Sequence, residues 1–165
     1  VDGKYNLSVG YIGPDAQVLG SASSSLGRAG RAIFTGKVTA DDGRSYGNRF
    51  HPTDSIDVTA AILVDPSHIG EKGFLVVAGI IAGEAFWLDP EGKFVRADAA
   101  RGQLLNLSSK SLELSEEIGI MTDFVPSNYG IQELVVEFYV GYGLDADPDE
   151  VFFNSIPMNL TIENN

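Results

Sequence analysis

Alternation with a period of two residues runs through most of this chain. Large apolar side chains occupy every second position near the N-terminus, and the pattern recurs in residues 32–40, 55–65, 131–142 and 156–162. Such alternation indicates strands that bury one face. No segment carries a convincing helical stripe with caps; residues 103–117 are the only arguable helix, and their serines weaken it. The sequence therefore predicts an all-β fold.

Turn signals separate the strands. Asp41-Asp42-Gly43 favours the left-handed backbone of a hairpin into residues 44–50, and Asp89-Pro90-Glu91-Gly92 is typical of a tight turn between two short strands. Residues 73–82 are apolar on both faces and rich in β-branched residues, so we expect a central strand there. About ten short strands of this kind predict an antiparallel β-sandwich, immunoglobulin-like with Greek-key connections.

The organisation of the chain changes near residues 48–52. We expect residues 1–49 to form an additional N-terminal β layer, or a donor strand over residues 4–12 followed by a hairpin, and residues 50–165 to form the sandwich, all within one compact unit. The stretch 20–30 has almost no large side chains. It suits a loop, a linker, or a thin strand beneath a close neighbour.

Charge and cysteine content exclude several classes of protein. The chain has 165 residues, a formal net charge of −12 and no cysteine. Disulfide frameworks, thiolate metal sites and cysteine nucleophiles are therefore absent. Nucleic acid and anionic lipid bind mainly to Lys and Arg, so we expect neither as a partner. The longest apolar run, residues 74–82, is about half of what a bilayer requires, and we expect no membrane insertion.

The compartment is indicated by the N-terminus and the composition. The chain begins at Val1 without an initiator Met, so we expect a leader to have been removed. An acidic, cysteine-free chain of this kind fits an extracellular or cell-surface protein, and an acidic cytosolic domain is the alternative. Asn-x-Ser/Thr sequons occur at Asn6, Asn106 and Asn159, but a chain this polar can carry such triplets by chance.

Three short segments carry a resemblance. They are Val-Asp-Pro-Ser-His-Ile-Gly at residues 64–70, Phe-Tyr-Val-Gly-Tyr at 138–142 and Asn-Ser-Ile-Pro-Met-Asn-Leu-Thr-Ile at 154–162. With the apolar central strand between the first two, they resemble an immunoglobulin-like β module found in large secreted and surface proteins of Gram-negative bacteria. The resemblance spans about residues 50–163. It implies a β-sandwich and brings no activity and no catalytic residue.

Catalytic signatures are missing from the sequence. The chain contains no Gly-x-Ser-x-Gly, Ser-x-x-Lys or His-Glu-x-x-His motif. Its two histidines, His51 and His68, lie in expected turns, where a structural role is the better interpretation. Two carboxylate pairs have a spacing that glycoside hydrolysis could use, but equally fit a solvated acidic face: Asp54 with Asp57, and Glu116 with Glu117. The sequence therefore predicts a protein that is not an enzyme.

Calcium is the one cofactor that the sequence suggests. Asp145, Asp147 and Asp149 alternate through an acidic stretch, and carboxylate oxygens at such spacing can bind a hard cation. The stretch is not an EF-hand, because Glu150 stands where that loop needs Gly. A solvated acidic turn is the competing interpretation.

Trp87 is the single tryptophan and lies beside an expected turn. If Phe86 points into the core, Trp87 points outward, where it could stack on a surface glycan. A role in the core or in an interface is the alternative.

The two terminal strands have the cleanest alternation, with four large apolar side chains each. These candidate subunit-contact residues are Tyr5, Leu7, Val9 and Tyr11, and Ile156, Met158, Leu160 and Ile162. A strand of this kind can complete its own sheet or be donated to a neighbouring subunit.

We therefore expect a non-enzymatic structural subunit of an extracellular assembly, such as a filament, pilus or surface layer. Its partner would be itself, in a homopolymer joined by β-strand contacts, with residues 4–12 as the donor strand. The alternative is a carbohydrate- or ligand-binding β-sandwich module of a surface protein that uses Trp87.

Overall fold

A computed structural model describes residues 24–97 and 106–164. These residues form strands and one short 3₁₀ turn, η1. In chain order the elements are β1 (Ser24–Ala29), β2 (Ala32–Ala40), β3 (Ser45–Tyr46), β4 (Arg49–Phe50), β5 (Ile56–Leu63), β6 (Lys72–Ile81), β7 (Glu84–Leu88), β8 (Phe94–Arg96), β9 (Ser108–Ser111), β10 (Ser115–Phe124), η1 (Pro126–Tyr129), β11 (Leu134–Leu144), β12 (Asp147–Phe153) and β13 (Met158–Ile162).

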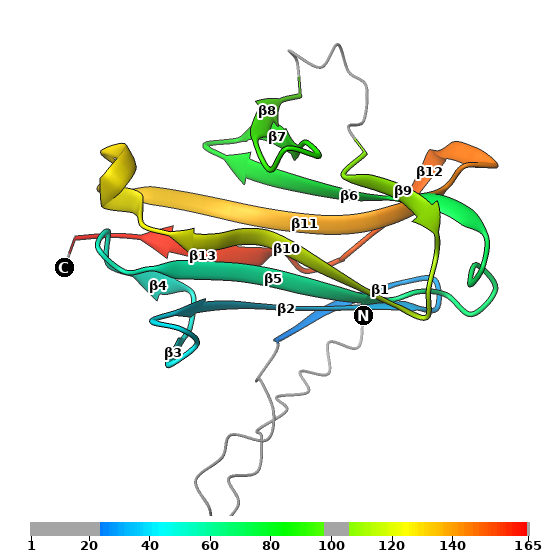
Figure 1. The fold of residues 1–165 in the computed structure, drawn as a ribbon, viewed down its shortest axis with the longest axis horizontal. Helices are drawn as coiled ribbons and strands as arrows, with labels where there is room; N and C mark the ends of the chain where they lie inside the picture. The colour runs from blue at the N-terminus through cyan, green and yellow to red at the C-terminus, as the bar shows by residue number, and fades with distance from the viewer. Residues whose placement is uncertain (1–23, 98–105, 165) are drawn as a thin grey trace, which may run out of the picture.

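The strands form two sheets that lie one over the other (Figure 1). The first sheet has the order β1-β2-β5-β10, with β3 paired to β2. The second has the order β4-β13-β11-β6-β7-β8, with β12 added beside β11 and β9 beside β6. Neighbouring strands run antiparallel, apart from the parallel pair of β13 and β4. The all-β antiparallel sandwich expected from the sequence is confirmed.

Alternating residues of the two sheets make the core between them. In β2, Phe34 and Val38 are buried while Thr35 and Lys37 between them are partly exposed. The same alternation buries every second residue of β5 and of β11, where the fully enclosed Tyr142 is the largest core side chain. The period-two pattern thus identified which face of each strand is buried.

β6 is buried on both faces, as its sequence predicted. Leu75 and Val77 join the core between the sheets, whereas Phe74 and Val76 are buried on the outer face of the second sheet. Phe74 lies against Gly143 of the paired strand β11, at the place where a Cβ atom would stand. Glycine in β11 therefore makes room for an outer apolar layer over β6.

Left-handed backbone occurs at several hairpin turns. Asp41 and Asp42 have φ of 54° and 56°, and Gly43 follows with 79°, which confirms the turn geometry expected there. Ala82 and Gly83, with φ of 50° and 81°, connect β6 to β7. Such turns match the twist of antiparallel strands, but alanine tolerates this backbone poorly.

The segment after the first hairpin differs from the expectation. The strand expected over residues 44–50 is split: β3 pairs with β2 for two residues, and β4 then pairs with β13 in the other sheet. The expected boundary at residues 48–52 therefore falls where the chain passes between sheets, and strands from both sides of it share the first sheet. For the small-residue stretch 20–30, a thin strand was one of three alternatives. Residues 24–29 of it form such a strand, β1.

Residues 108–124 contain β9 and β10, where no alternation in the sequence predicted a strand. The helix considered for residues 103–117 does not form over 106–117.

Candidate interaction site

The first sheet ends on β10, a strand of ten residues. β10 pairs with β5 on one side, and within residues 24–97 and 106–164 no strand pairs with the other side. Its register with β5 is regular from Ser115 to Gly119 and then shifts around Met121. β10 thus presents an open edge whose first half is regular and whose second half is bulged.

The remaining sheet edges in the described chain are shorter than β10 or partly covered. β4 has two residues, β8 three, β9 four and β12 seven. At β1, the Ile156 N–H donates to the Leu26 carbonyl at 3.0 Å, and Gly27 lies directly against the Ser155 side chain. An unpaired edge offers backbone donors and acceptors to another strand, and β10 offers the longest such edge here.

A buried carboxylate secures the start of this edge. Glu116 points inward from β10 and is 3 % exposed. The Lys110 ammonium of β9 lies 2.9 Å from Glu116 Oε2 and 3.1 Å from Glu113 Oε1. The Glu113 N–H also donates to Glu116 Oε1 at 2.7 Å. The bonds to Glu116 and then to Glu113 raise the pKa of Lys110, and the group connects the two sheets.

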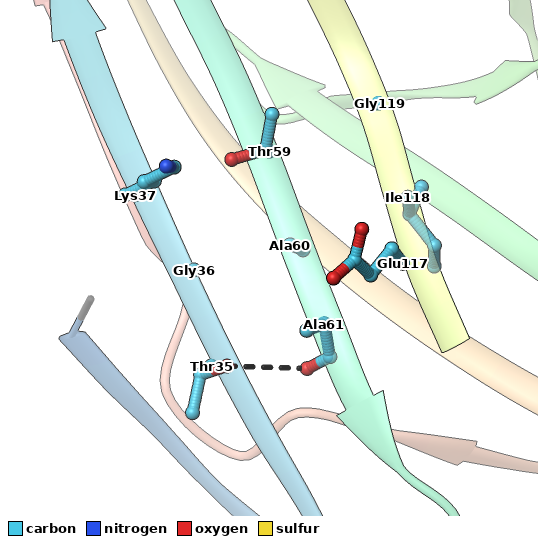
Figure 2. Close-up of a pocket in the computed structure, with 9 residues that line it drawn as sticks. All are labelled: Thr35, Gly36, Lys37, Thr59, Ala60, Ala61, Glu117, Ile118 and Gly119. Atoms are coloured by element: carbon cyan, nitrogen blue, oxygen red, sulfur yellow. Dashed lines mark hydrogen bonds between the residues drawn. The ribbon is translucent and has the colours of Figure 1, made fainter. Parts of the chain in front are cut away.

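The outer face of the first sheet has a shallow hollow beside this edge, with a volume of about 490 Å³. Figure 2 shows that small side chains of β5, Thr59 and Ala61, form its floor, between Lys37 of β2 and Glu117 of β10. The lining contains no aromatic ring and no imidazole. It therefore lacks both a stacking platform and a proton-transfer group of the histidine type.

Trp87 lies on the outer face of the second sheet. Phe86 shares the opposite face with Leu88, which is buried in the core. The cross-strand register aligns Tyr139, Ala78 and Trp87 on neighbouring strands, so that a small residue separates two aromatic ones. Both rings are partly exposed.

The turn between β5 and β6 is organised around Asp65, which is 8 % exposed. Its carboxylate accepts bonds from the Ser67 N–H at 3.0 Å and the Ser67 hydroxyl at 2.7 Å, and it pairs with the Arg31 guanidinium at 2.9 Å. These contacts, led by those of Ser67, hold the pKa of Asp65 well below its usual range. The carboxylate is thereby fixed in its charged form.

Tyr142 lies beneath this turn. Its hydroxyl oxygen accepts a bond from the Asp65 N–H at 3.3 Å and lies 3.0 Å from His68 Nδ1. A hydroxyl can accept one hydrogen bond and donate another, so it can bridge the Asp65 N–H and the His68 ring. Burial, and to a smaller extent the Asp65 charge, raises the pKa of Tyr142. Because Tyr142 is fully buried, its hydroxyl connects this turn to the core.

The two terminal strands fall in different parts of the chain. The expected donor residues Tyr5, Leu7, Val9 and Tyr11 lie outside the described residues. Met158, Leu160 and Ile162 lie in β13, which pairs with β11 of the same chain, and all three are buried in the core. Ile156 precedes β13 and is 38 % exposed. β13 therefore completes its own sheet.

The acidic stretch does not gather its carboxylates. Asp145 lies in a two-residue turn, and Asp147 and Asp149 lie in the extended strand β12, all exposed. In the described part of the chain, no three His, Asp or Glu side chains are grouped to hold a metal ion. Calcium binding by Asp145, Asp147 and Asp149 stays a prediction.

The other candidate groups also have local structural contacts. His51 Nδ1 lies 2.8 Å from the Thr53 hydroxyl in an exposed turn, as expected of a structural histidine. Glu116 and Glu117 point to opposite faces of β10, so they cannot flank one substrate bond. Asp57 Oδ1 accepts a bond from the Asp123 N–H at 2.9 Å.

The sequence did not indicate that Glu116, considered as half of a carboxylate pair, and Asn154 would be buried. Both are 3 % exposed and both are fully engaged in hydrogen bonds. No local motif marks either one. The Asp65 turn did have a signal, because Asp-Pro-Ser is typical of a turn in which the aspartate accepts local N–H bonds.

Comparison with protein-family models, curated proteins and solved structures finds no match for this chain. In the described ranges, no helix has the length and apolar character needed to cross a bilayer. The molecule is thus defined by its architecture, a β-sandwich with one long open edge among the residues described.

Proposed function

We propose that this protein is a non-enzymatic structural subunit of an extracellular assembly, such as a filament, pilus or surface layer. Its subunits are joined by β-strand contacts, and residues 4–12 are the donated strand. The observation that carries the proposal is the open edge of β10, because an unpaired edge of this length is a template for strand addition.

The strand order supports an immunoglobulin-like arrangement for the subunit. β2-β5-β10 opposite β13-β11-β6-β7-β8 corresponds to strands A-B-E opposite G-F-C-C′-C″ of such sandwiches. This correspondence agrees with the resemblance to modules of bacterial surface proteins. The acidic, cysteine-free composition supports a location outside the cell or on its surface.

The donor strand is tested by changing its apolar face while leaving the sandwich intact. Leu7→Asp with Val9→Asp adds two charges to that face, and Asn6→Asp with Ser8→Asp adds the same charges to the alternate face. We expect the wild-type chain and the second variant to form concentration-dependent multimers by light scattering. The first variant should associate at least about a hundred-fold more weakly, since it loses two buried side chains.

Thermal unfolding serves as the control for folding in these variants. Equal midpoints for the two variants would assign the difference in assembly to the contact itself. A wild-type chain that stays monomeric up to high concentration, or two variants that assemble equally, would contradict the proposal.

The aromatic pair on the second sheet supports one alternative function, a carbohydrate- or ligand-binding module. Trp87 and Tyr139 flank Ala78 on one face, which is a suitable spacing for rings that contact a planar or sugar ligand. Tryptophan fluorescence during titration with glycans tests it. A change that Trp87→Ala abolishes would support this function, and no change across a broad panel would exclude it.

A further inference from the structure

The acceptor of the donated strand can be located on the molecule. We propose that the open edge of β10, over Ser115–Gly119, binds residues 4–12 of a second copy of this chain. The inference rests on the proposed function and adds the partner surface, which the sequence alone did not indicate.

The topology of the first sheet leaves room for one more strand beside β10. In immunoglobulin sandwiches, strand D lies beside strand E and closes that sheet. If β10 corresponds to strand E, the described residues supply no strand at the place of strand D. A strand added beside β10 would therefore restore the four-strand order A-B-E-D.

The charges of the two segments are complementary. Residues 4–12 contain Lys4 and no acidic residue, whereas the regular half of β10 presents the exposed Glu117 and no basic residue, the buried Glu116 being already paired with Lys110. Opposite charges on neighbouring strands are favourable, and like charges are not. The donor segment therefore suits this edge, while two copies of β10 pairing with each other would bring acidic residues together.

The register of β10 with β5 limits where a further strand can pair. β10 is regular from Ser115 to Gly119, and the bulges around Met121 disturb pairing beyond that point. In the regular half, Ile118 faces the core and Glu117 and Gly119 face outward. A donor strand whose apolar face turns inward would leave Asn6 and Ser8 on the outward face, beside Glu117 and Gly119.

Disulfide trapping tests the contact, because the natural chain contains no cysteine. Ser8→Cys in one batch of chain and Gly119→Cys in another are mixed and oxidised. A Cβ atom at Gly119 would meet nothing within 4 Å, so this substitution leaves the sandwich intact. Asn6→Cys with Glu117→Cys is a second pair. The matched control acceptor is Ser45→Cys, an exposed position on β3.

We expect the mixed disulfide dimer of at least one β10 pair to exceed that of the same donor with Ser45→Cys several-fold. If the chains assemble but cross-link equally at β3 and β10, the acceptor lies elsewhere, which overturns this inference and leaves the proposed function standing. A different outcome is that a chain carrying both Ser8→Cys and Gly119→Cys cross-links within itself as a monomer. That result would show that residues 4–12 bind β10 of their own chain, and it would overturn the proposal of a second copy. A chain that never assembles overturns both proposals.

Discussion

The side-chain oxygen of Asn154 accepts a hydrogen bond of 2.7 Å from the backbone N–H of Val140. Along this side of β11, β13 pairs with residues 134–138 and β12 with residues 141–144. Val140 lies between the two pairings. Asn154, which links β12 to β13, therefore replaces a missing strand partner and also donates to the Ile156 carbonyl at 2.8 Å.

Replacing Asn154 by alanine should reduce the free energy of unfolding by about 2 kcal/mol, because the buried Val140 N–H loses its acceptor. Urea denaturation measures the change. Asn159→Ala, at an exposed position of β13, is the control and should stay within about 0.5 kcal/mol of wild type. Equal effects of the two substitutions would contradict the role assigned to Asn154.

Tyr142→Phe should destabilise the protein by about 1 kcal/mol, since the Asp65 N–H and His68 lose the hydroxyl between them while the ring packing remains. Tyr139→Phe is a matched control on the same strand, at a partly exposed position. Denaturant unfolding of both variants measures the difference. If Tyr142→Phe leaves the free energy of unfolding unchanged, the buried hydroxyl contributes nothing to stability.

Gly143→Ala should cost about 1–3 kcal/mol, because the new methyl group would overlap the Phe74 ring and come within 2.9 Å of the Glu150 carbonyl. Gly119→Ala adds the same methyl where nothing lies within 4 Å. Thermal unfolding of the two variants should separate them clearly. Similar midpoints would argue against a packed outer layer over β6.

Ala82→Asn should raise the free energy of unfolding by about 0.5–1 kcal/mol, because asparagine before Gly83 tolerates the left-handed backbone of this hairpin better than alanine does. Gly83→Ala should have the opposite effect at φ of 81°. Calorimetry measures both changes. A destabilising Ala82→Asn would indicate that the turn relaxes to another geometry.

The stability contributed by Asp65 should depend on pH. Its pKa in the folded protein lies below the usual 3.8, so the carboxylate stabilises the fold above that value. The stabilisation should fall as pH drops below about 4, towards the lowered pKa of the folded state. Asp65→Asn should therefore be less stable than wild type at pH 7, and the gap should narrow in acid.

Denaturation of both proteins at a series of pH values measures this gap. Asp149→Asn, at an exposed position of β12, is the matched control and should stay within about 0.5 kcal/mol of wild type at pH 7. A gap between wild type and Asp65→Asn that persists unchanged to pH 2 would contradict the prediction.

Alternation was sufficient to find most strands but not all of them. β2, β5, β11 and β13 each repeat apolar residues on one face, and these strands were predicted with the correct buried face. β10 was missed because Glu116 occupies an inward position and two bulges interrupt its period. β1 is ambiguous in sequence because Gly27 must be small to let Ser155 approach.

The candidate site depended on information that no local pattern contains. An edge is open or covered according to which strands pair, and those pairs join residues far apart in the chain. The contact between His68 and Tyr142, for example, spans 74 residues. The sequence therefore predicted strands, while the open edge of β10 emerged only from the topology.

The bond from Ile156 to Leu26 also has a consequence for the time course of folding. It joins residues separated by nearly the whole described length of the chain, and β4 likewise pairs with β13. Contacts of such long range slow folding, because a large loop must close before they form. During synthesis β1 can pair with β2 at once, but its bond to Ile156 and the pairing of β4 with β13 must wait until residues 156–162 have emerged, so these edges stay open to premature association until then.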